Sequence, residues 1–132
     1  MTHTEKELLL KDLCARLPYG VKLQKTYDTS EPVELYSIDL EHSDVKFYKY
    51  KGECLTICDA GFIERYGKLR FKPFLFPLSS MTEEQQIDLT KFVANGIMDE
   101  NIVYDWYNKN HFDYRGLIEK GLAIDATNLN IY

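Results

Sequence analysis

The stretch VKFYKY, residues 45–50, decides the fold class of this chain of 132 residues. Apolar and polar side chains alternate at its start, which is the two-residue period of a β-strand with one buried face. The polar turn cluster His42–Asp44 precedes the stretch, and Lys51 and Gly52 follow it. We therefore expect a strand at residues 45–50, bounded by a turn on each side.

Similar segments lie on both sides of this strand. Residues 21–27, 33–40 and 53–58 are rich in residues typical of strands, and short polar turns separate them. Short turns favour an antiparallel meander. Residues 69–72 alternate again, but Pro73 and Pro77 restrict the segment between them to an edge strand or an extended connection, because proline cannot donate to a sheet ladder.

Helical periodicity marks both ends of the chain. Residues 5–17 carry an apolar stripe that Pro18 and Gly20 end. That stripe comprises Leu10, Leu13, Cys14 and Leu17. A capping box, either Ser80 with Glu83 or Thr82 with Gln85, begins a second helix, which Gly96 ends. Asp99 caps a third helix, and a short last helix is expected at 114–120.

The sequence thus predicts a single α+β domain over residues 1–132. An N-terminal helix precedes a small, mainly antiparallel sheet of three to five strands. A C-terminal helical hairpin packs on one face of the sheet. The tail from about residue 125 is polar, and we expect it to be loosely ordered.

Cysteine usage and the first residues indicate a reduced, cytoplasmic setting. Three cysteines at irregular spacing do not form a disulfide framework. The N-terminus is polar and acidic, and Lys11 breaks the apolar run Leu8–Leu10 at once. Neither a signal peptide nor a membrane partner is therefore expected.

Charge is unevenly distributed along the chain. Residues 45–73 carry seven basic and three acidic residues, a net of +4, whereas residues 1–44 carry −4 and residues 74–132 carry −5. One interpretation is internal compensation between a basic sheet and acidic helices. The other is a basic sheet face that meets an acidic partner.

A basic, tyrosine-rich sheet face is the first candidate site. Lys46, Tyr48 and Tyr50 share one face of their strand, so bases can stack on tyrosine while lysine and arginine meet phosphates. The alternative is a solvated face with ordinary cross-strand neighbours. The candidate nucleic-acid contacts are Lys46, Lys49, Arg65, Lys68, Arg70 and Lys72.

The run DWYNKNHFDYRGLI, residues 105–118, is the second candidate site. Trp, Tyr and Arg dominate binding hot spots, although Trp106 and Tyr107 lie on the buried stripe of the predicted helix and suit core anchors better. Asp113 and Arg115 either pair with each other or cap a helix. With two residues of the sheet face, the candidate interaction residues are Tyr48, Tyr50, His111, Tyr114 and Arg115.

The cysteines offer two further candidate sites, which the sequence favours less. Cys54 and Cys58 are four residues apart, and His42 or His111 could complete a zinc site, but structural zinc sites usually need a second closely spaced ligand pair. Cys58 and His111 supply the residue types of a small cysteine enzyme, yet no family signature surrounds Cys58. We predict no metal, no cofactor and no catalytic residue.

Two motifs carry a resemblance to a known group of proteins. KPFLFPLSSMTEE at 72–84 and HFDYRGLI at 111–118 resemble small uncharacterised proteins of gut Bacteroidales genomes, many of them carried by phages, prophages and other mobile elements. The resemblance covers residues from about 70 to 124 and the opening helix through Gly20. It departs at Glu119 and Lys120, where relatives have a proline-containing segment.

The resemblance implies a bacterial, phage-linked accessory protein and brings no reaction, cofactor or catalytic residue. The expected function is therefore non-enzymatic, through interaction with a host or phage protein. Nucleic-acid binding by the basic sheet is the alternative, and a small enzyme using Cys58 and His111 is the second. The sequence does not indicate an oligomeric state.

Overall fold

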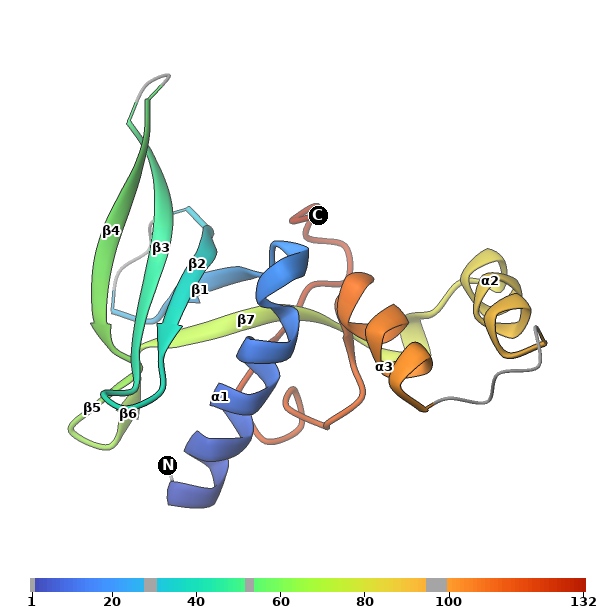
Figure 1. Ribbon diagram of the computed structural model, residues 1–132, viewed down its shortest axis with the longest axis horizontal. Coiled ribbons are helices and arrows are strands. Elements are labelled where there is room, and N and C mark those ends of the chain that lie inside the picture. Colours follow the sequence, from blue (N-terminus) through green and yellow to red (C-terminus); the bar gives the residue numbers. More distant parts are fainter. Residues whose placement is uncertain (1, 28–30, 52–53, 95–99) are drawn as a thin grey trace.

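The computed structural model describes residues 2–27, 31–51, 54–94 and 100–132, without the side chains of 49–51, 54–60 and 92–94. It is a mixed α+β protein with an N-terminal helix and a mostly antiparallel sheet, as predicted. In Figure 1 the meander of strands β2 (Val33–Asp39), β3 (Asp44–Lys51) and β4 (Cys54–Phe62) stands at one end of the molecule. Strand β7 (Phe71–Pro77) runs from it along the long axis toward helices α3 (Glu100–Lys109) and α2 (Glu83–Ala94).

The main sheet has the strand order β4-β3-β2-β1-β7-β8, and β9 also pairs with β7. All pairs from β4 to β7 are antiparallel, whereas β8 and β9 run parallel to β7. The main-sheet strands are β1 (Lys22–Lys25), β2 (Val33–Asp39), β3 (Asp44–Lys51), β4 (Cys54–Phe62), β7 (Phe71–Pro77), β8 (Phe112–Asp113) and β9 (Ile124–Asp125). The described residues thus give seven strands where three to five were expected, since β8 and β9 are too short to show a period.

The meander confirms the strand predicted at residues 45–50. Val45 and Phe47 are buried, and Lys46 between them is exposed. Beyond β4, strands β5 (Glu64–Arg65) and β6 (Lys68–Leu69) form a separate two-stranded hairpin. This hairpin lies at the meander end of the molecule (Figure 1).

Strand β7 differs from its prediction as an edge strand or connection. It lies between β1 and β8, so it is an interior strand. Pro73 is tolerated because it stands opposite Leu23 at the last position of the ladder with β1, where the missing N–H interrupts little pairing. Beyond Pro73, the strand pairs instead with β9 and β8.

Helix α1 (His3–Arg16) begins at Thr2, whose hydroxyl accepts a hydrogen bond from the N–H of Glu5. Leu9, Leu10 and Leu13 are buried, as an amphipathic helix requires. Asp12 and Arg16 are also fully buried, which the periodicity did not predict. Pro18 and Gly20 lie in and after a short 3₁₀ turn, as expected of residues that end the helix.

The core lies between α1 and the sheet. Apolar side chains of the helix meet those of the strands and of the segment after α3. Its members with no exposed surface are Leu9, Leu13, Val21, Leu23, Ile63, Phe71, Leu75 and Leu117.

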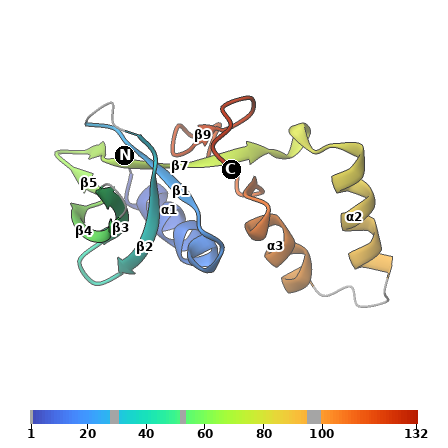
Figure 2. The ribbon, with the colours of Figure 1, turned by 90° about the horizontal axis from the view of Figure 1, so that it is seen from above.

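Helices α2 (Glu83–Ala94) and α3 (Glu100–Lys109) were expected to form a hairpin on the sheet, and the structure does not show this arrangement. The capping box is present, since Thr82 and Gln85 exchange side-chain and backbone hydrogen bonds. However, α2 stands away from the sheet at the far end of the molecule, and α3 lies beside α1 (Figure 2). The predicted caps Gly96 and Asp99 lie outside the described residues.

The short helix predicted at residues 114–120 is wrong. The segment forms turns, because the Asp113 carboxylate accepts hydrogen bonds from the N–H groups of Leu117 and Ile118. Gly116 and Gly121 have φ of 74° and 73°, a left-handed conformation that interrupts helical continuation. The segment is flanked by β8 and β9 instead.

Candidate functional site

A buried ionic cluster, here called the Asp12 cluster, holds α1 to the segment after α3. Arg16 donates from Nε to Asp12 Oδ2 at 2.8 Å, and its Nη2 donates to the Phe112 carbonyl oxygen at 2.6 Å. Arg115 Nη1 donates to Asp12 Oδ1 at 2.8 Å. Asp12 and Arg16 lie one helical turn apart, so they share the face that meets the later segment. The cluster comprises Asp12, Arg16 and Arg115.

His111 lies beside this cluster, directly after α3. Its ring stacks on that of Tyr132, with centroids 3.7 Å apart and planes 11° from parallel. Burial first, and then the positive charges of Arg16 and Lys22, lower the pKa of His111 to about 4. The imidazole is therefore neutral at physiological pH.

Tyr132 fastens the C-terminal segment across two strands. Its hydroxyl accepts a hydrogen bond from the backbone N–H of Lys22 and donates one to the carbonyl of Phe74. Lys22 Nζ donates to the Ile131 carbonyl at 2.8 Å. Burial raises the pKa of Tyr132 far above its usual range, so the hydroxyl stays protonated and can donate.

Three of the predicted interaction residues are thus engaged within the chain. His111 stacks on Tyr132, and Arg115 pairs with Asp12 rather than with Asp113. Tyr114 donates its hydroxyl proton to Asn108 and stacks on Tyr104 with centroids 4.9 Å apart. These side chains position α1, α3 and the C-terminal segment relative to one another.

The two tyrosines predicted on the sheet face have different outcomes. Tyr48 is half-buried and meets the half-exposed Tyr36 edge to face, with centroids 5.0 Å apart. The side chain of Tyr50 lies outside the described part of the chain. Tyr36, which the sequence analysis did not single out, therefore joins Tyr48 on this face because it lies on the neighbouring strand.

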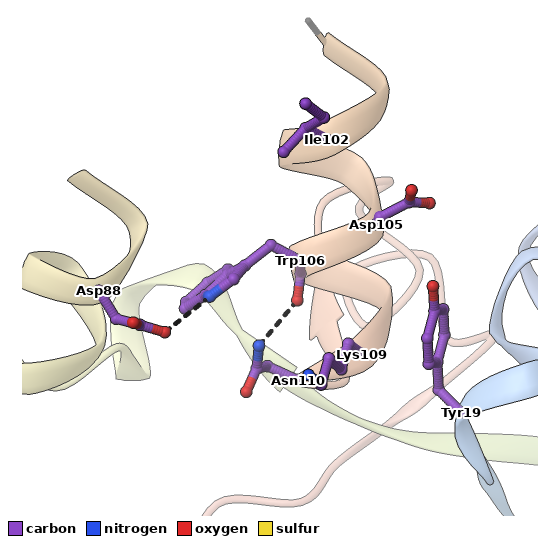
Figure 3. Close-up of a pocket in the computed structure, with 7 residues that line it drawn as sticks. All are labelled: Tyr19, Asp88, Ile102, Asp105, Trp106, Lys109 and Asn110. Atoms are coloured by element: carbon purple, nitrogen blue, oxygen red, sulfur yellow. Dashed lines mark hydrogen bonds between the residues drawn. The ribbon is translucent and has the colours of Figure 1, made fainter. Parts of the chain in front are cut away.

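A hollow of about 320 Å³ lies beside Trp106, between α3, α2 and the turn after α1 (Figure 3). The buried Trp106 donates from its indole nitrogen to Asp88 of α2 at 3.0 Å. We call this the α3 hollow. It is lined by Tyr19, Asp88, Ile102, Asp105, Trp106, Lys109 and Asn110.

A second hollow, of about 350 Å³, lies on the α2 side and has part of its lining in common with the α3 hollow. It adds Glu84, Gln85 and Lys91 of α2 to Asp88, Trp106 and Asn110. Trp106 is thus a wall common to both hollows. The sequence analysis singled out Trp106 as a core anchor but missed Asp88, because nothing in the spacing of α2 indicates that its carboxylate meets an indole.

The predicted basic residues with described side chains come from several elements and have different surroundings. Arg70 lies over the Tyr27 ring at 4.5 Å, and Arg65 lies over the Tyr66 ring at 5.3 Å. Lys46 is exposed on β3, and the side chain of Lys49 is outside the described residues. Lys68 and Lys72 are separate from these and line a hollow of their own.

That hollow, here called the lysine hollow, has a volume of about 400 Å³. It brings Lys68 and Lys72 together with Lys120, which the sequence analysis missed because Lys120 belongs to the acidic last third of the chain. Glu5, Thr26, Leu69, Gly121 and Leu122 complete the lining.

The structure describes the side chains of only some of the cysteine and histidine candidates. Cys54 and Cys58 have side chains outside the described residues. His42 Nδ1 lies 2.8 Å from Asp39 Oδ2, and that hydrogen bond raises the pKa of His42. Burial raises the pKa of the Cys14 thiol, which disfavours the reactive thiolate. Within the described residues, no group of three or more ligating side chains could hold a metal ion.

No family model, curated protein or solved structure matches this chain. None of the helices in the described ranges has the length and apolar character needed to cross a membrane.

Proposed function

We propose that the protein is a non-enzymatic accessory protein of a phage or other mobile element, and that it binds a partner protein at the α3 hollow. The observation that supports this proposal is the setting of Trp106, a large aromatic wall between two hollows. Helix α2 meets the rest of the chain at this residue through the Asp88 hydrogen bond. Pockets that accept a ligand or a partner side chain are usually lined by apolar and aromatic side chains, with a few polar groups among them.

The lining of the α3 hollow indicates the kind of side chain that it accepts. Tyr19, Ile102 and Trp106 offer apolar surface, and the exposed Asp105 carboxylate lies at the same hollow. A volume of about 320 Å³ suits one large side chain or two small ones. We therefore expect a partner segment with an apolar anchor beside a basic residue.

Helices α2 and α3 also leave apolar side chains exposed to solvent. Ile87 of α2 is 56% exposed, and Tyr104 of α3 is 42% exposed. None of the described α2 side chains, at 83–91, is buried. A helix that leaves its surface open in this way is a suitable element for an interface.

The test is affinity capture with variants that leave the core intact. Tagged wild-type protein is incubated with a nuclease-treated lysate of Bacteroidales cells, the hosts that the sequence resemblance implies, and captured proteins are identified by mass spectrometry. Asp105→Arg should remove the specific partner, because it places a positive charge where a basic residue is expected to bind. Cross-linking should place that partner at α3.

The matched control is Glu41→Arg, which makes the same charge change at an exposed site in the turn between β2 and β3. This variant should retain the partner. Capture of the same proteins by both variants, at equal yield, would contradict docking at the α3 hollow.

A further inference from the structure

Three lysines from separate parts of the chain converge on the lysine hollow. Lys68 comes from β6, Lys72 from β7 and Lys120 from the turn before β9. None of the three ammonium groups has a hydrogen-bond or ion-pair partner in the part of the chain that the structure describes. The lining includes one carboxylate, that of Glu5, so the charged groups of the hollow sum to +2 at neutral pH.

Like charges at one hollow repel, and a bound anion removes that repulsion. The repulsion is local, since the whole chain carries a net charge of −5. Lysine ammonium groups are compact donors that suit phosphate oxygens. The open hollow of about 400 Å³ leaves room for a chain to continue on either side of a bound phosphate.

The neighbouring hairpin supplies an independent observation. Tyr66 and Gly67 form the two-residue turn between β5 and β6, with φ of 54° and 73°. Two-residue turns with positive φ at both positions strongly prefer Asn-Gly, and a bulky residue in that conformation is strained. Such strain is often retained at functional sites.

Tyr66 is also displayed to solvent. It is 89% exposed, although a tyrosine would normally bury part of its ring, and the Arg65 guanidinium lies 5.3 Å from the ring centroid. Lys68 of the lysine hollow follows it by two residues in the same hairpin. An aromatic ring beside cationic groups is the combination with which proteins bind single-stranded nucleic acid.

We propose that the lysine hollow binds a phosphate group of single-stranded nucleic acid, with a base of the same strand stacked on Tyr66. Lys68, Lys72 and Lys120 contact the phosphate, and Arg65 adds positive charge beside the Tyr66 ring. This site is independent of the proposed partner site, because the β5–β6 hairpin and α2 lie at opposite ends of the molecule (Figure 1).

The test is fluorescence anisotropy with a short, labelled single-stranded oligothymidylate at increasing salt. Replacing two of the three phosphate contacts in Lys68→Gln/Lys120→Gln should weaken binding about 10-fold at low salt. It should also reduce the slope of log affinity against log salt by up to about 0.7, the value for one neutralised phosphate of a single strand. Lys91→Gln, on α2 at the other end of the molecule, is the matched control and should bind as the wild type does.

Tyr66→Asn separates binding from folding. It should weaken binding about 10-fold by removing the stacking ring. Its thermal stability should equal or exceed that of the wild type, because Asn adopts positive φ more readily than Tyr does. Loss of both binding and stability would contradict the assigned role.

Other outcomes would also overturn the proposal. These are no binding by the wild type, an unchanged salt slope in the double variant, or equal competition by a polyglutamate peptide of matched charge. Complete competition by inorganic phosphate together with unchanged binding by Tyr66→Asn would reduce the hollow to a small-anion site, without nucleic acid.

Discussion

Helices α1 and α2 are of similar length, 14 and 12 residues, yet their surroundings differ completely. Helix α1 buries leucines on the sheet and two charged residues in the Asp12 cluster. Of α2, the described side chains at 83–91 are exposed or half-buried, and a hydrogen bond from Trp106 ties it to α3. Stability therefore concentrates around α1, whereas α2 keeps most of its described side chains at the surface.

Breaking the Asp12 cluster should have the largest effect. Asp12→Ala leaves two arginines near each other without their shared carboxylate, and we expect the free energy of unfolding to fall by about 3–5 kcal/mol. Urea denaturation followed by circular dichroism measures this change. The exposed neighbour Lys11 provides the control, since Lys11→Ala should stay within about 0.5 kcal/mol of the wild type.

A small loss in Asp12→Ala, similar to that in Lys11→Ala, would mean that the cluster does not stabilise α1. The contrast between the two helices would then rest on the apolar core alone. Arg115→Ala offers an intermediate test, because its side chain is 17% exposed and water can partly solvate the change.

Removing the hydrogen bond between Trp106 and Asp88 of α2 should lower the stability less, and only locally. Asp88→Ala deletes the acceptor of the Trp106 indole. Since Asp88 is exposed, we expect a loss of about 1 kcal/mol, below the usual range for bonds to charged groups. Hydrogen exchange of amides at 83–91 should become about 5-fold faster, while amides of Leu9 and Leu13 stay unchanged.

Gln86→Ala is the control for this variant, because it removes another exposed side chain from the same helix. Equal acceleration of exchange in α1 and α2 by Asp88→Ala would show that the two helices open together. In that case the difference between them would be one of exposure and not of stability.

Lowering the pH should destabilise the region around α1, where His111 lies beside the Asp12 cluster. The unfolded chain protonates His111 near pH 6.5, whereas the pKa of His111 in the folded protein is lowered to about 4. Between these values the unfolded state binds more protons, so stability should fall as pH falls from about 6.5 to about 4. The effect is the smallest of the three, because the ring is only partly buried and water screens its charge.

The urea midpoint measured across this pH range checks the expectation. His111→Asn is the matched variant, because Asn tolerates the φ of 62° at this position and does not titrate. Its stability should lose the part of the pH dependence that His111 causes. An identical pH profile in both proteins would exclude His111 as the titrating group.

Local chemistry in the sequence predicted the local structure well. Alternation identified the strand around Val45 and Phe47, and the capping box at Thr82 and Gln85 formed as expected. These features depend on residues near one another in the chain. They do not depend on which distant part of the chain packs against them.

Features that need long-range pairing could not be predicted in the same way. The sequence did not indicate that Asp12 and Arg16 are buried, because burial of a charge is favourable only when a partner such as Arg115 arrives from elsewhere. Lys120 belongs to an acidic part of the sequence, so nothing in the sequence indicated that it lines the same hollow as Lys68. The Asp113 carboxylate replaced a predicted helix by a turn, since it binds two backbone N–H groups.

The Asp12 cluster has a consequence for the order in which the chain folds. The ion pair between Asp12 and Arg115 joins positions 103 residues apart, and the bond between Lys22 and Tyr132 joins positions 110 apart. Strands β2, β3 and β4 instead pair with their neighbours in sequence. Closing a long loop costs entropy before its contacts form, so the meander can assemble early. Helix α1, although it comes first in the sequence, therefore completes its surroundings among the last.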